Sequence, residues 1–203
     1  MRYKIIDNAL VVSGDFEALS SGVEGGRKPV EHILNIQVPY DFPHDDPKNH
    51  IRDTVLSLRL GGSYTALLTA VEMQSAQILT DACVTVFVTA GIRNPSSFGT
   101  INIIVVSSTK LSEEAMVGTI ITATESKTRA LFDMGFRFTG TVTDAVVVAY
   151  ENSSENEPIL YSGSATFFGR KVVKLVRQGV KDALKAHYDG KILKADNKSG
   201  DCS

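Results

Sequence analysis

The sequence predicts an α/β protein of the α+β type, in which long helices pack on one mixed β-sheet. Two near-continuous apolar runs, Val84–Ala90 and Thr100–Ser107, are typical of strands covered on both faces. Two long segments with helical spacing of apolar residues, 112–134 and 164–188, supply the helices. The 203 residues are 43% hydrophobic, which is enough for a domain with a real core. No stretch has the composition of a linker, so residues 1–188 are expected to form one domain.

The first part of the chain predicts two strands, an irregular segment and a helix. Tyr3–Ser13 is rich in β-branched residues, which indicates a strand or one arm of a hairpin, and His32–Val38 indicates a second short strand. Pro39–His50 holds three prolines and several aspartates, so it is expected to be irregular. Tyr64–Thr80 has apolar residues near one face at helical spacing, which predicts a helix; they are Leu67, Leu68, Val71, Ala76 and Leu79.

The central part predicts two paired strands, a helix and a third strand. The connection Gly91–Gly99 is short, so the two apolar strands are expected to pair antiparallel. Ser112 can cap the helix that follows, which is expected to end near Met134, before a left-handed Gly135. A crossover through this helix would place the next strand, Ala145–Tyr150, parallel to an earlier one.

The last part predicts a short return strand, one long helix and a tail. Ile159–Tyr161 is short enough to be only the return arm of the preceding strand. Ser164 is predicted to cap the last helix, which reaches about Tyr188. Residues 189–203 are polar and are predicted to form a frayed C-terminal tail.

Composition argues against several classes of protein. Lys+Arg 21 against Asp+Glu 23 gives a formal net charge of −2, which does not favour nucleic-acid binding. Cys83 and Cys202 form neither a disulfide framework nor a zinc motif. The start of the sequence does not resemble a signal peptide, and no apolar run approaches the roughly 20 residues that cross a membrane. The expected location is therefore the cytoplasm, without membrane partners.

Seven segments, in order along the chain, resemble the adenosylcobinamide amidohydrolase family of corrinoid salvage. They are LSS (Leu19–Ser21), HILNIQVP (His32–Pro39), VTAGIRN (Val88–Asn94), GTINIIV (Gly99–Val105), ITATESKTRAL (Ile121–Leu131), TGTVTDAVVVA (Thr139–Ala149) and YSGSAT (Tyr161–Thr166). The resemblance implies a hydrolase of the amide bond that joins the aminopropanol tail to the corrin ring of adenosylcobinamide. The implied product is adenosylcobyric acid. The corrinoid is then the substrate and partner, and no cofactor is predicted.

Three positions depart from the family pattern. Glu24 and Gly118 stand where Asn is usual, and Val142 stands where Gly is usual. Such changes could alter the preferred corrinoid. Gly118 and Val142 also leave open a second hypothesis, in which the chain is a non-catalytic corrinoid-binding module.

Amide hydrolysis needs an activated nucleophile, a polarised carbonyl and a proton for the departing amine. No Ser-His-Asp spacing is visible and the four histidines lie outside the central block, so a carboxylate-activated water is the predicted nucleophile. Glu125 and Asp144 are the predicted catalytic carboxylates, provided that they face one pocket. The alternatives are a surface ion pair of Glu125 with Arg129 and a turn closed by Asp144. Lys127 is predicted to hold the scissile carbonyl or a carboxylate, with a solvated lysine as the alternative.

A corrin ring fringed by amides calls for neutral donors and acceptors. The predicted substrate-binding residues are Asn35, Asn94, Asn102, Thr122, Thr124, Thr141, Thr143 and Ser164. A threonine nucleophile, Thr124 or Thr143, is the alternative to activated water. His32, His44 and His50 lack ligand spacing, so no metal is predicted. The sequence does not indicate the oligomeric state, and a homodimer is suggested only by the commonness of twofold assemblies.

Overall fold

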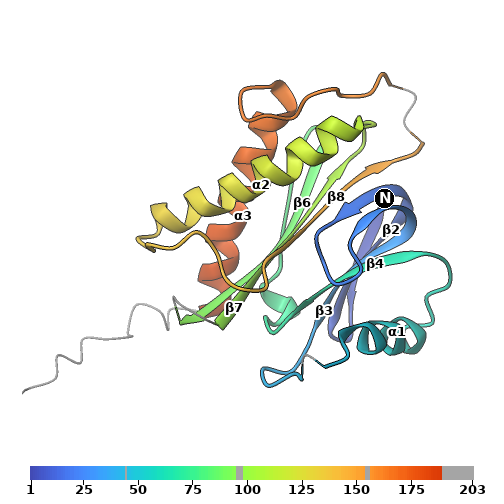
Figure 1. The fold of residues 1–203 in the computed structure, drawn as a ribbon, viewed down its shortest axis with the longest axis vertical. Helices are drawn as coiled ribbons and strands as arrows, with labels where there is room; N and C mark the ends of the chain where they lie inside the picture. The colour runs from blue at the N-terminus through green and yellow to red at the C-terminus, as the bar shows by residue number, and fades with distance from the viewer. Residues whose placement is uncertain (44, 95–97, 154–155, 189–203) are drawn as a thin grey trace, which may run out of the picture.

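The computed structural model describes residues 1–43, 45–94, 98–153 and 156–188 of the chain. The described residues form one mixed sheet with three α-helices, which confirms the predicted fold class. The strands are β1 (Arg2–Ile6), β2 (Ala9–Ser20), β3 (Gly26–Gln37), β4 (Tyr64–Thr69), β5 (Gln77–Asp81), β6 (Val84–Asn94), β7 (Phe98–Ser107) and β8 (Ala145–Glu151). The helices are α1 (Pro47–Ser57), α2 (Glu113–Asp133) and α3 (Phe167–Tyr188), with a short 3-10 turn η1 (Met73–Ser75) (Figure 1).

The strands lie in the order β4-β3-β2-β8-β7-β6-β5, and β1 pairs with β2 at the side. The β6–β7 pair is antiparallel and the β7–β8 pair is parallel, as the sequence predicted for these segments. A second parallel pair, β3 with β4, is joined through α1. Both parallel pairs therefore use a helix as their connection, as parallel strands require.

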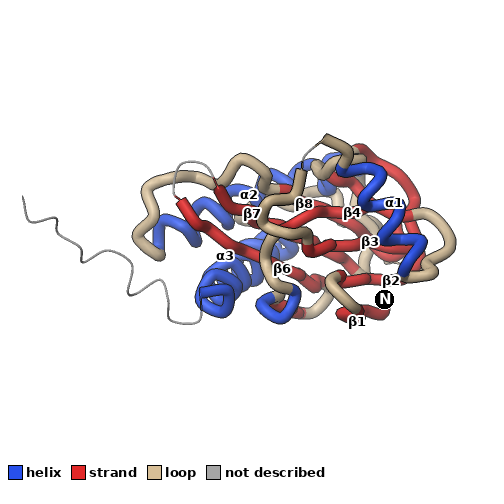
Figure 2. Tube along the Cα trace, turned by 90° about the horizontal axis from the view of Figure 1, so that it is seen from below, coloured by secondary structure: helices blue, strands red, loops and turns tan. Residues whose placement is uncertain are grey.

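The sheet bends sharply along β2. Residues 9–13 of this strand pair with β1, whereas residues 16–20 pair with β8, and the register shifts between Ser13 and Phe16. Such a bulge lets a strand bend and turn its two ends toward different neighbours. As a result the two halves of the sheet face each other across a shared core (Figure 2). Tyr3 of β1 contacts Phe87 of β6 there, with ring centroids 5.3 Å apart.

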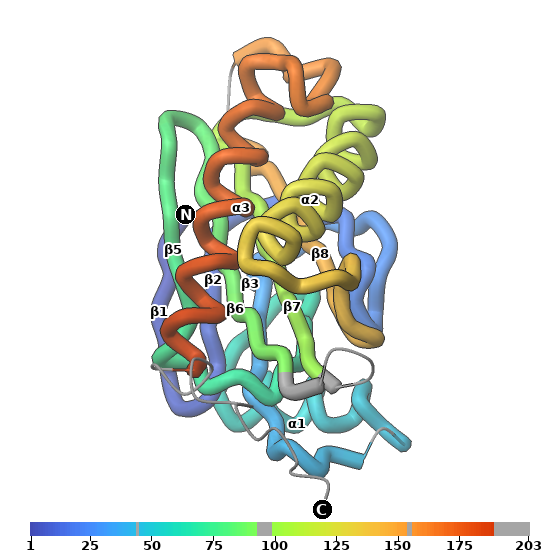
Figure 3. The backbone as a smooth tube through the Cα atoms, turned by 90° about the vertical axis from the view of Figure 1, so that its left-hand side faces the viewer, coloured from blue at the N-terminus to red at the C-terminus, as the bar shows by residue number. Residues whose placement is uncertain are grey.

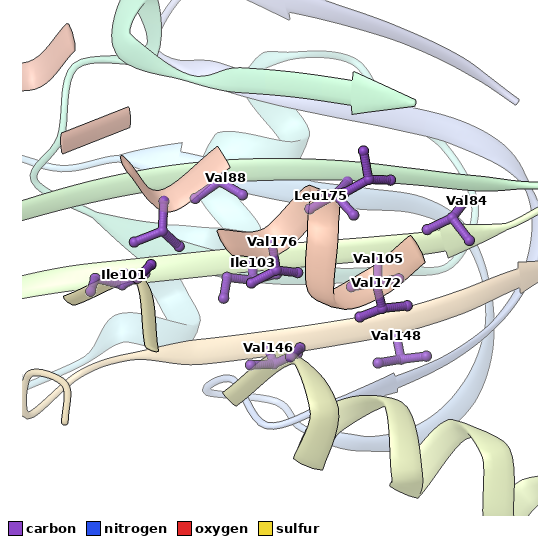
Figure 4. Close-up of a cluster of buried hydrophobic side chains, with 14 of the residues drawn as sticks. Val84, Val88, Ile101, Ile103, Val105, Val146, Val148, Val172, Leu175 and Val176 are labelled. Atoms are coloured by element: carbon purple, nitrogen blue, oxygen red, sulfur yellow. The ribbon is translucent and has the colours of Figure 1, made fainter. Parts of the chain in front are cut away.

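Alternating side chains of the bent sheet fill three apolar cores. The first lies between β6–β8 and the helices α2 and α3, which cover the same face of the sheet (Figure 3). Val88 of β6 and Ile103 of β7 belong to this core and lie beside Val176 of α3 (Figure 4). The second core fills the space between the two half-sheets, and the third lies between the β2–β4 region and α1. Both faces of β6 and β7 are thus covered, as their apolar runs predicted.

Helix α2 has the predicted ends. The Ser112 hydroxyl accepts a hydrogen bond from the Ala115 N–H at 3.2 Å, and Gly135 adopts a φ of +88° after the last turn. Inside the helix, a Cβ on Gly118 would lie 2.7 Å from Ser162 Oγ. The close packing of Ser162 on α2 therefore explains why position 118 is a glycine.

The helix predicted over Tyr64–Thr80 is wrong. This segment forms β4, η1 and β5 instead. Leu67 and Leu68 fit a helical period, but β4 adds to the edge of β3 in parallel register and buries Thr65, Leu67 and Thr69 in the sheet. Pairing with a distant strand has overridden the local periodicity.

Three smaller expectations also need correction. The segment expected to be irregular contains the start of α1, which is capped by the Asp46 carboxylate and has Pro47 in its first turn. Helix α3 begins at Phe167, and its first turn is capped by Thr166, whose hydroxyl accepts from the Gly169 N–H at 2.9 Å, rather than by Ser164. Ile159 forms only an isolated bridge to Leu111 instead of a return strand.

No helix in the described part of the chain combines the length and apolar character needed to cross a membrane. The predicted tail, 189–203, lies outside the described residues.

Candidate active site

A cavity of about 640 Å³ lies where the ends of several strands meet. Its walls come from the β2–β3 loop, the segment after β3, the end of β4, the β6–β7 edge, the start of β8 and the last turn of α3. The lining residues are Ser21–Val23, Val38–Tyr40, Phe42, Pro47, Leu67–Val71, Gly91, Ile92, Gly99, Thr100, Val142–Ala145 and His187. The bend of the sheet brings these segments together from across most of the chain.

The cavity is mainly apolar, with a few polar groups. Aliphatic and aromatic side chains such as Val38, Phe42 and Leu67 form its walls, and the hydroxyls of Thr100 and Thr143 lie at the β7–β8 side. Among the described lining residues there is no lysine or arginine. A cavity with this lining suits an uncharged ligand that presents both apolar surface and amide groups.

Asp144 stands at the edge of the cavity and is held by several donors. Its Oδ1 accepts from the Ile101 N–H at 2.9 Å, and its Oδ2 accepts from the Thr141 N–H at 3.0 Å and from Lys127 Nζ at 2.5 Å. The Thr141 hydroxyl lies 2.5 Å from Oδ1 as a further donor. A carboxylate offers about four acceptor positions. The Asp144 carboxylate is therefore largely occupied by the protein itself.

The Lys127–Asp144 ion pair is largely buried, with side-chain exposures of 9% and 11%. Lys127 reaches it from α2 and is not among the residues that line the cavity. Gly140 makes room for the pair, because a Cβ at this position would collide with both Lys127 Nζ and Asp144 Oδ2. Of the two partners expected for Lys127, a scissile carbonyl or a carboxylate, the structure places the Asp144 carboxylate beside it.

Threonine hydroxyls extend this network along the edge of the sheet. The Thr143 hydroxyl donates to the Gly99 carbonyl at 3.0 Å and lies 2.7 Å from the Thr100 hydroxyl. The Thr141 hydroxyl also lies 2.7 Å from the Gly99 carbonyl, but its single proton can serve only Gly99 or Asp144. One arrangement satisfies every group: Thr141 donates to Asp144, Thr143 to Gly99, and Thr100 to Thr143. The Thr100 oxygen then keeps acceptor capacity toward the cavity.

A second polar network, made of Asn35, Thr89 and Asn102, lies buried behind the cavity wall. Asn35 Nδ2 donates to Thr89 Oγ1, and Asn102 Nδ2 donates to both Asn35 Oδ1 and the Leu68 carbonyl, all within 2.9 Å. These bonds join β3 and β4 to β6 and β7 across the interior, so they fix the distance between the two half-sheets. Asn102 Oδ1 is buried and finds no hydrogen-bond partner among the described residues. Asn35 and Asn102 thus do not line the cavity; they hold in place the strands that form its wall.

His187, in the last turn of α3, lies in the cavity although the sequence did not indicate it. Its Nε2 would lie 3.0 Å from a Cβ on Gly91, so the ring rests directly on the backbone of β6. The neighbouring Tyr188 ring is 4.8 Å away, and the Tyr188 hydroxyl accepts a hydrogen bond from the Ile92 N–H. Two consecutive residues therefore attach the end of α3 to two consecutive residues of β6.

Other predicted site residues lie away from the cavity. Glu125 is exposed on α2, so the expected meeting of Glu125 and Asp144 in one cavity is not found, and Arg129 pairs with Asp133 rather than with Glu125. Thr122 donates to the Ser162 carbonyl, and Thr124 is exposed and donates to the Ile120 carbonyl.

Ser164 and Asn94 are the two remaining residues of the predicted binding set. Ser164 lines a separate surface hollow of about 480 Å³ beside α3. Asn94 pairs with Phe98 through its backbone, and its side chain lies outside the described part of the structure.

The described residues contain no group of three or more His, Cys, Asp or Glu that could hold a metal ion. The absence of a metal requirement stays a prediction.

Comparison with known proteins decides the family. The family model described as adenosylcobinamide amidohydrolase matches residues 9–191. The chain belongs to the adenosylcobinamide amidohydrolase family. It is similar to the adenosylcobinamide amidohydrolase of Methanosarcina mazei, with 46% identity over 91% of this chain and 98% of that protein. It is also similar to that of Halobacterium salinarum, with 30% identity over 82% of this chain and 79% of that protein. As an amidohydrolase, the chain is a hydrolase that acts on carbon–nitrogen bonds.

The segments that resemble the amidohydrolase family largely surround the cavity. Five of the seven place a residue in its lining, namely Ser21, Val38, Gly91, Thr100 and Asp144. The segment Ile121–Leu131 places no residue in the lining, but its Lys127 contacts Asp144, which does line the cavity. The departure at Val142 lies in the lining as an exposed side chain, where it can affect which ligands fit.

Proposed function

We propose that this amidohydrolase cleaves the amide that joins the aminopropanol tail to the corrin ring of adenosylcobinamide, releasing adenosylcobyric acid. Membership of the family supports the substrate, as do the names of the two similar proteins. The observation that carries the proposal is the lining of the cavity. Its apolar walls, threonine hydroxyls and lack of described cationic side chains suit an amide-bearing neutral arm of a macrocycle.

Asp144 and Lys127 are proposed to position the site rather than to transfer protons. The Asp144 carboxylate bonds the backbone of Ile101 in β7 and of Thr141 before β8, so it joins the two segments that carry Thr100 and Thr143. With these donors in place, it has little capacity left to accept a proton from water. Its ion pair with Lys127 anchors the same edge of the sheet to α2.

Water is the proposed nucleophile. Of the two threonines predicted as alternatives, Thr124 is exposed on α2 and lies outside the cavity lining, whereas Thr143 lines the cavity. Attack by Thr143 would leave an acyl group on its oxygen. We expect intact-protein mass spectra taken during turnover to show no such adduct. A mass increase mapped to Thr143 would replace water by a covalent mechanism.

The purified protein should be incubated with adenosylcobinamide, and adenosylcobyric acid and aminopropanol should be measured by mass spectrometry. We expect both products in equal amounts. Asp144→Asn should lower turnover, because the amide side chain brings a donor to a position surrounded by donors. Glu125→Gln should turn over as the wild type does, and a loss in this variant would return Glu125 to the catalytic set.

The non-catalytic hypothesis is tested by the same experiment. Corrinoid binding can be measured from the change in its visible absorption. Tight binding with no product after long incubation would favour a binding module. Gly118 no longer motivates this hypothesis, since Ser162 packing explains it. Val142 is the remaining departure from the family pattern that supports this hypothesis. If the hypothesis holds, Val142→Gly is expected to restore turnover.

A further inference from the structure

We propose that His187 is the residue that transfers protons in this cavity, taking one from the attacking water and giving one to the departing amine. The inference deepens the proposed function and rests on it. It assigns the central chemical step to the end of α3, far in sequence from the threonine-rich segment that lines the opposite side.

Few of the described groups that line the cavity can exchange protons. Side chains able to exchange protons there are Tyr40, Asp144 and His187. Asp144 is occupied by backbone N–H groups, Thr141 and Lys127. A tyrosine hydroxyl is a weak acid, with an ordinary pKa about 3 units above neutrality. Imidazole is the side chain whose ordinary pKa lies nearest neutrality, which makes it the usual group for proton transfer.

The fold makes room for the His187 ring beside β6. The pairing of β5 with β6 ends at Gln77 and Val88, so the β6 edge beyond Val88 is left for another element. The last turn of α3 uses this edge: Tyr188 accepts the Ile92 N–H, and His187 passes to the inner side at Gly91. A Cβ at position 91 would also lie 2.7 Å from Val71 Cγ2. Only a glycine there lets the imidazole and Val71 approach the strand together.

Threonine hydroxyls lie on the same face of the sheet as the His187 ring. Gly91 lies opposite Thr100 in the β6–β7 register, so the Thr100 side chain points to the same face as the ring on Gly91. Thr100 in turn lies beside Thr143, with 2.7 Å between the hydroxyl oxygens. A substrate amide placed over this row has hydroxyl groups on one side and an imidazole on the other.

The step balances without any further reactant. Neutral His187 takes a proton from water as the oxygen attacks the amide carbon, which forms the new C–O bond. The imidazolium then gives that proton to the amide nitrogen as the C–N bond breaks. The new carboxylic acid releases its proton, and the amine leaves as an ammonium ion. The imidazole is returned neutral.

The test compares His187→Ala with wild type under saturating adenosylcobinamide. We expect kcat to fall about 100-fold or more, with KM changed by less than about 3-fold. Added imidazole should restore a concentration-dependent part of kcat, because the deleted ring leaves a space that opens to the cavity. The control is His32→Gln, since His32 lies outside the cavity and is held between Ser13 and the Gly61 carbonyl. Its kcat and KM should match those of wild type.

Two outcomes would overturn the inference alone: wild-type kcat in His187→Ala, or an effect confined to KM. His187→Gln, which keeps a polar side chain of similar size, should lose kcat equally while its melting temperature and corrinoid absorption change show that it folds and binds. Failure of the wild type itself to release product would instead overturn the proposed function, and this inference with it.

Discussion

Lys127 and Asp144 form the residue pair on which the edge of the cavity depends. Removing the charge at position 127 leaves a largely buried carboxylate without its cation, which is destabilising. Lys127→Met should therefore lower the free energy of unfolding by about 3 kcal/mol, measured by urea denaturation. Lys174→Met is the matched control, because Lys174 is 71% exposed beside Asp81 and should change stability by about 0.5 kcal/mol or less. Equal effects of the two substitutions would show that the Lys127 pair is not buried as described.

Gly140 offers a second test at the same point. A methyl group at position 140 must displace the Lys127 ammonium or the Asp144 carboxylate, because no space separates them from the glycine. Gly140→Ala should cost about 2 kcal/mol in unfolding free energy, in the range for overpacking, and should lower turnover. Gly61→Ala is the control, since a Cβ there meets nothing within 4 Å. If the two variants melt alike, the packing argument for Gly140 fails.

At the level of elements, the first turn of α3 depends on Thr166 and not on Ser164. The Thr166 hydroxyl accepts the Gly169 N–H, which would otherwise lack a partner in the helix. Thr166→Ala should lower the free energy of unfolding by about 1 kcal/mol, whereas Ser164→Ala should leave it nearly unchanged. Urea denaturation of both variants decides between the two caps. A larger loss in Ser164→Ala would restore the cap predicted from the sequence.

Elements were predictable where their local signals agree with their neighbours in space. β6, β7 and β8 are apolar on both faces because both faces are covered, and α2 carries both of its end signals in the sequence. The segment over Tyr64–Thr80 was not predictable from its own pattern. Its leucines fit a helix, and only the edge of β3, some 30 positions earlier in the chain, makes β4 a strand. Local periodicity does not contain that information.

At the level of the whole molecule, the site could be predicted only in part. Asp144 and Thr143 were found because polar groups at a strand end are conspicuous in the sequence, and Lys127 because it lies in a matching segment. His187 could not be found in this way: it is the next-to-last residue of a long amphipathic helix, and only the bent sheet and the short β5 bring it to Gly91. The prediction for Glu125 did not hold, because the orientation of α2 that buries Lys127 leaves Glu125 exposed to solvent.

Ionic contacts attach α3 to the rest of the molecule and should make the free energy of unfolding depend on pH in the acidic range. Hydrogen bonds from Arg177 and Lys181 of α3 hold the pKa of Asp133, at the end of α2, well below its usual range. Hydrogen bonds from Lys171 and Lys174 lower the pKa of Asp81, at the end of β5, to about 2. Because both pKa values are lower in the folded than in the unfolded chain, these contacts stabilise the fold fully above about pH 4. Their contribution is lost as the pH falls from about 4 toward 2.

Replacing one of these carboxylates should therefore flatten the acid side of the stability profile. Asp133→Asn should be less stable than wild type at pH 6, and the difference should shrink steadily as the pH falls below about 4, because the wild type then loses the same contacts by protonation. Urea denaturation at steps between pH 6 and pH 2 measures both profiles. Glu125→Gln, which removes an exposed carboxylate from the same helix, should run parallel to wild type throughout. A constant gap between Asp133→Asn and wild type down to pH 2 would mean that the attachment of α3 does not depend on the charge of Asp133.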